Sequence, residues 1–237
     1  MRKVFVCELR RLLLNKFFFG ILAAVLLYGW LLLSGEVILG VAYTAPFSPW
    51  SFGYYLARLL PLLWAGTLFF LTFFTSEGER RTAVLTDATA VDPRRFAGVR
   101  CMALLVGMLL LLGAAVLLAA VFFAYTLHWH DWGSLLLPLL AIAAPPLVFA
   151  AGSGWLLGGA CPWLVYGWML APFILSALPL PEALGLWNGT LLRSYPLTLP
   201  ADPPFTLPAA VWVAQGLLLL AGLLLLGVRI FRRGRRA

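Results

Sequence analysis

Six apolar runs recur along this chain and limit what it can fold into. Short polar intervals separate them, and they cover residues 17–33, 50–74, 99–127, 134–157, 163–178 and 209–228. A helix of about 20 apolar residues crosses a bilayer, and a soluble domain has no use for six such runs. Since 63% of the residues are hydrophobic and 11% charged, we expect a polytopic membrane protein. The fold class is therefore all-α, with six transmembrane helices in one domain over residues 1–237.

The positions of lysine and arginine predict how the chain is oriented. They fall into three clusters, near the N-terminus, between the second and third runs, and at the C-terminus: Arg2, Lys3, Arg10, Arg11, Lys16; Arg80, Arg81, Arg94, Arg95, Arg100; Arg229, Arg232, Arg233, Arg235, Arg236. Only Arg58 and Arg193 lie elsewhere. By the positive-inside rule, both termini face the cytoplasm of a multi-pass protein in a bacterial inner membrane. The net charge of +8 thus reflects contact with the lipid bilayer, not with nucleic acid.

The first 16 residues have the pattern of an amphipathic helix. An apolar stripe recurs at helical spacing: Phe5, Leu9, Leu12 and Leu13. The remaining positions include the basic residues that can meet lipid phosphates: Arg2, Lys3, Arg10 and Arg11. The pattern predicts an interfacial helix over residues 1–16, and the alternative is a basic flank that only orients the first span.

The polar interval over residues 75–98 contains two helix starts. Ser76 followed by Glu79 forms a capping box, which predicts a short polar helix directly after the second span. Asp92 can cap a second helix with Pro93 at its first position, and that helix continues into the third apolar run. A short ordered helix here is a candidate contact for a cytoplasmic partner. The alternative is an ordinary capped loop.

Two further segments have patterns that predict local structure. The fourth run is interrupted by Pro138 and by the pair Pro145-Pro146, and it ends in glycines. Gly154 and Gly158 have the GxxxG spacing that lets another helix approach closely. The longest external segment, residues 179–208, is rich in proline and apolar residues, which predicts short helices dipping into the outer interface.

Arg58 is the one ionisable residue well inside a predicted span. An arginine at the centre of a membrane helix costs about 2.5–3.5 kcal/mol on insertion scales, so it needs a partner or water. Its side chain can extend outward, towards Glu36 in the first external loop. The alternative is a role in a transport path or at a subunit interface.

The residues offer little catalytic chemistry. The only lysines are Lys3 and Lys16, and neither follows a phosphate-binding glycine loop. His128, His130 and Asp131 have the spacing of metal ligands but suit an aromatic external turn better, so we expect no metal. Ser153 and the two histidines would lie on opposite sides of the bilayer, which disfavours an intramembrane protease. We expect no catalytic residue and no enzyme activity in this chain.

The stretch SEGERRTAVLTDATAVDPRRFAGVR, together with the six spans and the N-terminal helix, resembles the permease subunits of type-two ABC exporters. That family usually has a glycine before the threonine and a lysine near the end of this segment, where Arg81 and Arg100 stand here. The resemblance implies that residues 75–98 form a coupling helix that docks on a cytoplasmic ABC-type ATPase subunit. ATP and magnesium would be bound by that partner, and this chain would hold no cofactor.

The resemblance also implies roles for individual residues. The ATPase contacts would be Glu77, Glu79, Arg80, Arg81, Thr82, Leu85, Asp92, Arg94 and Arg95. Arg58 and Pro172 would lie on the substrate path or at the interface with a second permease subunit, in a homodimer or heterodimer. The cargo would be a hydrophobic or amphipathic drug, peptide or lipid. The alternative function is an ATP-independent transporter or channel, which the lack of an in-span carboxylate and of an internal repeat disfavours.

Overall fold

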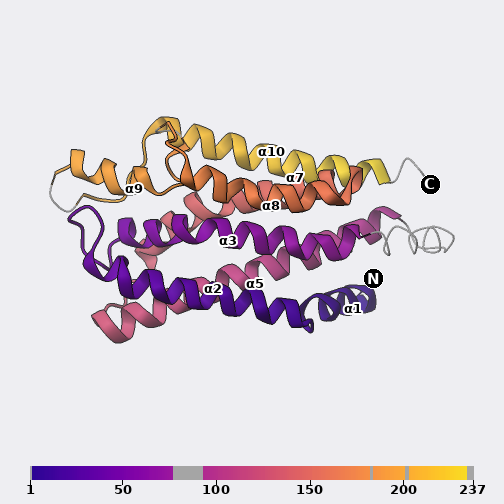
Figure 1. Cartoon of the computed structure of the whole chain (residues 1–237), viewed down its shortest axis with the longest axis horizontal. Helices are drawn as coiled ribbons and strands as arrows, with labels where there is room; N and C mark the ends of the chain where they lie inside the picture. The colour runs from indigo at the N-terminus through magenta and orange to yellow at the C-terminus, as the bar shows by residue number, and fades with distance from the viewer. Residues whose placement is uncertain (1, 77–92, 182–183, 201–202, 234–237) are drawn as a thin grey trace.

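The computed structural model describes residues 2–76, 93–181, 184–200 and 203–233, and no β-strand occurs among them. The longer helices lie side by side along the long axis of the molecule (Figure 1). In chain order the elements are α1 (Arg2–Leu13), α2 (Lys16–Gly35), η1 (Val37–Leu39), α3 (Pro49–Thr75), α5 (Pro93–Leu127), η2 (Gly133–Leu135), α6 (Leu136–Pro138), η3 (Leu139–Ala143), α7 (Ala144–Ala160), α8 (Pro162–Ala177), α9 (Thr190–Ser194), η5 (Tyr195–Thr198) and α10 (Ala209–Arg233).

The all-helical fold is confirmed among the described residues, and it is consistent with the predicted multi-pass membrane protein. In the described part of the chain, five helical stretches are long and apolar enough to cross a bilayer: Lys16–Leu39, Pro49–Thr75, Arg94–Leu127, Gly133–Ala160 and Ala209–Val228. The fifth predicted span corresponds to α8, which is apolar but has only 16 residues. At 1.5 Å per residue, α8 is roughly 24 Å long. A crossing of the bilayer by α8, and with it the total of six crossings, therefore remains a prediction.

The helices begin where short polar side chains and prolines favour a start. Ser48 caps α3 by accepting a hydrogen bond from the backbone N–H of Ser51 at 3.2 Å, and Pro49 takes the first helical position. The carboxamide oxygen of Asn15 accepts from the N–H of Phe17 at 3.2 Å and separates α1 from α2. Pro93 opens α5, as the sequence predicts, and this helix continues without a break into the third apolar run.

Helix α3 is the centre of the bundle. Most of its residues are buried, and it contacts α2 and α5 on one side and α7 and α8 on the other. Polar groups on α3 are satisfied inside this packing: the hydroxyl of Tyr55 donates to the carbonyl oxygen of Ala115 on α5 at 2.9 Å. The outer helices α2 and α10 leave most of their apolar side chains at least partly exposed, as expected of surfaces that face lipid.

The prolines of the fourth span change its hydrogen-bond pattern locally without ending the helix. A π-helical turn, η3, lies between Pro138 and the pair Pro145-Pro146, and helical structure runs from Gly133 to Ala160. Proline lacks the N–H that an α-helix needs, and a wider turn accommodates the carbonyls left without a donor. The interruption that the sequence predicts is therefore a local change of helix type.

Two sets of glycines let neighbouring helices approach α7 closely. A Cβ atom on Gly154 would collide with Leu68, and one on Gly158 would lie 2.7 Å from the Cγ2 atom of Thr75, so the predicted GxxxG pair faces α3. On another face, Gly152 of α7 meets Gly222 of α10. A Cβ atom on Gly222 would lie 2.7 Å from the backbone nitrogen of Phe149.

The N-terminal helix α1 packs on the start of α5. Leu12, at 1% exposure, is buried beside Gly107, while Phe5 and Leu13 pack against the core. The apolar stripe thus contacts protein, and the predicted position of α1 on a lipid surface stays a prediction. Between the two helices, Glu8 Oε1 accepts a hydrogen bond from Arg100 Nε at 3.0 Å, and both side chains are at most 10% exposed.

The bundle has two distinct ends. α1, the end of α3 and the start of α5 lie at one of them, here called the basic end, at the right of Figure 1. The connection over residues 36–48 and helix α9 lie at the other, here called the loop end. The short helices predicted for residues 179–208 are found as α9 and η5, and this segment docks on α3 through the hydrogen bond from Trp50 Nε1 to the carbonyl oxygen of Pro203 at 3.0 Å.

Candidate functional site: a groove between α2, α3 and α8

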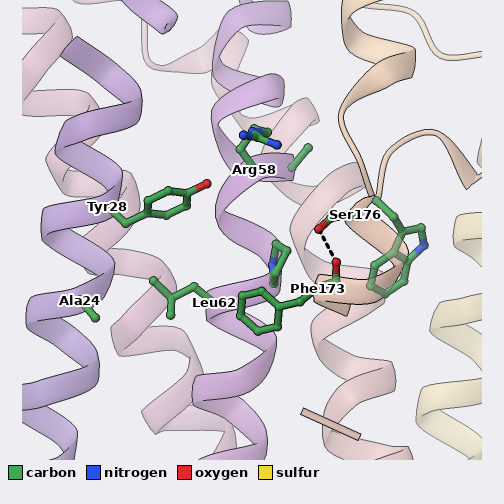
Figure 2. Close-up of a pocket in the computed structure, with 9 residues that line it drawn as sticks. Ala24, Tyr28, Arg58, Leu62, Phe173 and Ser176 are labelled. Atoms are coloured by element: carbon green, nitrogen blue, oxygen red, sulfur yellow. Dashed lines mark hydrogen bonds between the residues drawn. The ribbon is translucent and has the colours of Figure 1, made fainter. Parts of the chain in front are cut away.

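A cavity of about 320 Å³ lies between α2, α3 and α8 (Figure 2). It is on the half of the bundle nearer the loop end, because Arg58 belongs to the N-terminal half of α3. It is lined by Ala24, Tyr28, Ala57, Arg58, Pro61, Leu62, Phe173, Ser176 and Trp187. Ala24 and Phe173, the latter 43% exposed, form an open rim, so the cavity is a groove on the side of the bundle. Its walls are apolar apart from a few polar groups, which is the usual composition of a small-molecule site.

A cluster of tryptophans supports the inner wall of the groove. The ring centroid of Trp64 lies 5.4 Å from that of Trp187 and 5.7 Å from that of Trp168. Trp64 Nε1 donates to the carbonyl oxygen of Trp168 at 3.1 Å, and Trp168 Nε1 donates to Ser153 Oγ at 2.9 Å. Because each of these indole N–H groups has an acceptor, the cluster forms a rigid apolar wall that joins α3, α7 and α8.

Arg58 is the charged residue of the groove, and its predicted direction is confirmed. Its Nη2 atom lies 3.8 Å from Glu36 Oε1, so the side chain extends from α3 towards the loop end. Arg193 reaches the same carboxylate from α9, with 3.7 Å between its Nη2 atom and Glu36 Oε2. Two arginines against one glutamate leave this cluster with a formal surplus of one positive charge.

The hydrogen bonding of the cluster leaves part of Arg58 unused. The hydroxyl of Tyr54 donates to Glu36 Oε2, and the guanidinium of Arg193 lies 5.1 Å from the centroid of the Tyr54 ring. The distance of 3.8 Å between Arg58 and Glu36 permits ionic attraction but is too long for a direct hydrogen bond. The Nε atom of Arg58 is buried and has no hydrogen-bond partner among the described residues.

The groove also contains backbone and hydroxyl groups. Pro61 cannot donate the N–H that would normally bond to the carbonyl of Ala57, and both residues line the cavity. Tyr28 extends from α2 across the groove towards Arg58 (Figure 2). Ser176 Oγ donates to the carbonyl oxygen of Phe173 at 2.8 Å, so this hydroxyl is engaged within α8.

The structure places the other predicted site residues in different parts of the molecule. Pro172 is buried within α8 beside Phe173, and it does not line the groove. Arg94 and Arg95 are exposed in the first turn of α5, at the basic end. The other predicted ATPase contacts lie outside the described residues: Glu77, Glu79, Arg80, Arg81, Thr82, Leu85 and Asp92. Ser76 ends α3 with extended backbone angles, as an N-cap residue also would.

The geometry supports neither a metal site nor a serine protease, the two chemistries weighed in the sequence analysis. Within the described residues, no three His, Cys, Asp or Glu side chains gather in a way that could hold a metal ion. Ser153 donates to the carbonyl oxygen of Phe149 at 2.6 Å and accepts from Trp168, so its hydroxyl contributes to the packing of α7 against α8.

Arg193 is a site residue that the sequence analysis does not predict, although the sequence contains a signal for it. Arg58 and Arg193 are the only basic residues outside the three clusters, and the structure brings both to Glu36. One isolated cation inside a span, a second in an external segment and a carboxylate in the first external loop thus indicate an ion cluster. Tyr28 and Trp187 carry no such signal, because aromatic residues near span ends are common.

Comparison of the chain with protein-family models, with curated proteins and with solved structures gives no match.

Proposed function

We propose that this chain is the membrane-spanning permease subunit of an ATP-driven exporter of the ABC type. It would cross the bacterial cytoplasmic membrane six times with both termini in the cytoplasm, and separate ATPase subunits would bind ATP and magnesium. The observation that carries this proposal is the joined set of helices at the basic end. There the hydrogen bond from Arg100 to Glu8 joins α5 to α1, and α5 directly follows the segment proposed to contact the ATPase.

The packing of these helices suits the transmission of force. A push on the connection between α3 and α5 acts directly on both helices, and the buried contact between Glu8 and Arg100 makes α1 move with α5. Helix α3 runs without interruption from the basic end to Arg58 in the groove. A displacement at one end can therefore change the width of the groove near the other end, as in rigid-body switching between two states.

The groove supports a transport role because it lies open on the side of a single subunit. Apolar residues of α2 and α8 surround it, and many of them are exposed, including Leu27, Leu31, Leu170 and Ile174. A second permease subunit facing this surface would enclose the groove between the two chains. Arg58 would then lie on the enclosed path, and the amphipathic cargo would contact both its charge and the apolar walls.

Association with an ATPase tests the proposal. We expect the full chain to co-purify with an ABC-type ATPase from its native membrane. The double charge reversal Glu77→Lys and Glu79→Lys should reduce the recovered ATPase by about tenfold or more, because two charge-assisted contacts are lost. Quantitative immunoblotting of the eluted complex measures the ratio of the two proteins.

The matched control is Asp131→Lys, a charge reversal in the turn before η2, away from the proposed contact. It should leave the recovered ATPase unchanged. Equal recovery from the double variant and the control would contradict the proposed contact. Transport that continues without any ATPase and follows a proton gradient would support the ATP-independent transporter instead.

A further inference from the structure

We propose that the groove binds an anionic amphiphile, with its charged head group on Arg58 and its apolar chain along Leu62, Phe173 and Trp187. The statement that this molecule is the exported cargo rests on the proposed function. Binding itself is a property of this chain alone. Figure 2 shows the arrangement that supports it, with Arg58 at one level of the groove and Ala24, Leu62 and Phe173 at another.

The charge of the head group follows from the ion cluster. Glu36 is shared between Arg58 and Arg193, so the cluster has one positive charge in excess. An anion bound beside Arg58 would neutralise this surplus. A bound cation would instead add to the repulsion between the two arginines.

The donors of Arg58 are the second argument for an anion. No direct hydrogen bond joins its guanidinium to Glu36 at 3.8 Å, and its buried Nε has no partner among the described residues. A buried donor without an acceptor is unfavourable, so an oxyanion beside Arg58 would gain the strength of a charge-assisted hydrogen bond. Phosphate and carboxylate oxygens match the planar geometry of the guanidinium.

The remainder of the groove specifies an apolar chain. Pro61, Leu62, Phe173 and Trp187 offer no side-chain charge, and the tryptophan cluster behind them is rigid. The volume of about 320 Å³ lies within the range of small-molecule sites and is much too small for a folded partner. Because the groove opens on the side of the bundle, a molecule already dissolved in the membrane can enter it. The chemistry therefore fits a lipid or a lipid-like anion.

The experiment measures binding of dodecyl phosphate to the purified full chain in a neutral maltoside detergent, by native mass spectrometry. Arg58→Gln should weaken this binding by about tenfold or more, and Arg58→Lys should weaken it less. Glu36→Gln should strengthen it by about fivefold, because it removes the competing carboxylate while Arg58 remains. Opposite effects of these two neutralising substitutions distinguish a binding role from a general loss of folding.

Two further variants serve as controls. Arg10→Gln removes one positive charge from the exposed face of α1, at the basic end, and should leave binding within about twofold of the original. Leu62→Trp fills the groove while all charges remain, and it should abolish binding. Inorganic phosphate at the same concentration should not bind, because it has no apolar chain.

A competition experiment with phosphatidylglycerol distinguishes the two possible sources of the amphiphile, a bilayer lipid and a single-chain cargo. Displacement of dodecyl phosphate by phosphatidylglycerol would identify a bilayer lipid, and failure to displace it would identify a single-chain cargo. Unchanged binding in Arg58→Gln, or in Leu62→Trp, would overturn the inference. That result would leave the proposed function standing, because association with the ATPase is measured through residues 77 and 79.

Discussion

Replacement of Glu8 by alanine is expected to lower the free energy of unfolding by about 2–3 kcal/mol. Arg100 would remain in place with 6% of its surface exposed, without the carboxylate that accepts its Nε–H at 3.0 Å. The substitution removes a charge-assisted hydrogen bond from a guanidinium that is nearly buried, and such bonds contribute more to stability than bonds between neutral groups. The contacts of Arg100 with the rings of Phe74 and Phe96 compensate only in part. Equilibrium unfolding in mixed micelles measures the loss.

The matched control for this prediction is Arg10→Ala, on the exposed side of the same helix, which should change stability by about 0.5 kcal/mol or less. Hydrogen exchange of residues 2–13 should increase in Glu8→Ala and not in the control, because α1 separates from α5. The double variant Glu8→Met and Arg100→Met should recover most of the lost stability, since neither member of the buried ion pair remains to be desolvated. If Glu8→Ala cost no more than Arg10→Ala, this ion pair would not hold α1 in place.

The second large effect is expected at the contact between α7 and α10. Substitution of Gly222 by alanine should destabilise the protein by about 2–3 kcal/mol, because the new methyl group would meet backbone atoms that cannot rotate away. Its Cβ atom would lie 2.7 Å from the nitrogen and 2.8 Å from the Cα atom of Phe149. The two helices would have to separate, and the adjacent contact at Gly152 would be lost as well. Thermal unfolding in detergent measures the change.

Gly216 provides the control on the same helix. A Cβ atom there meets nothing within 4 Å, so Gly216→Ala should be neutral or stabilising by up to about 1 kcal/mol, through the higher helix propensity of alanine. Opposite signs for the same substitution, six positions apart, would show that the effect at Gly222 comes from packing. A loss at Gly216 equal to that at Gly222 would contradict this explanation.

The helices themselves were predictable from local sequence. Six apolar runs and Pro93 before the third run are local signals, and α5 begins at this proline. Pro49 begins α3 one residue before the predicted second span. The pair Gly154 and Gly158 also acts locally, because its spacing alone defines one face of a helix. The sequence predicts an interruption at Pro145 but not the π-helical turn before it, because proline shows where a backbone hydrogen bond is lost but not how the chain replaces it.

Contacts between residues far apart in the chain were harder to predict from the sequence. Glu8 and Arg100 are separated by 92 positions, and Leu12 from the apolar stripe of α1 lies beside Gly107 of α5. Amphipathic spacing shows that one face is buried but does not identify the surface that covers it. Gly152 and Gly222 lack a shared spacing motif for the same reason, because they lie on different helices.

The candidate site was partly predictable. An arginine inside a span needs a partner, and Glu36 in the neighbouring loop was the nearest carboxylate, so the pair was found from the sequence. The groove beside it depends on how α2, α3 and α8 pack, which no local pattern determines. The predicted ATPase contacts from Glu77 to Asp92 lie outside the described residues and stay predictions.

The length of α8 has a consequence for the membrane around it. In the proposed topology α8 is the fifth of the six crossings, yet it is about 6 Å shorter than a hydrocarbon layer of roughly 30 Å. Lipids respond to such a mismatch by thinning, which brings water and head groups closer to the midplane. Ser176, near the end of α8, lines the groove that contains Arg58, so the thinned region lies beside this arginine. A locally lowered membrane surface would let a charge well inside α3 remain hydrated.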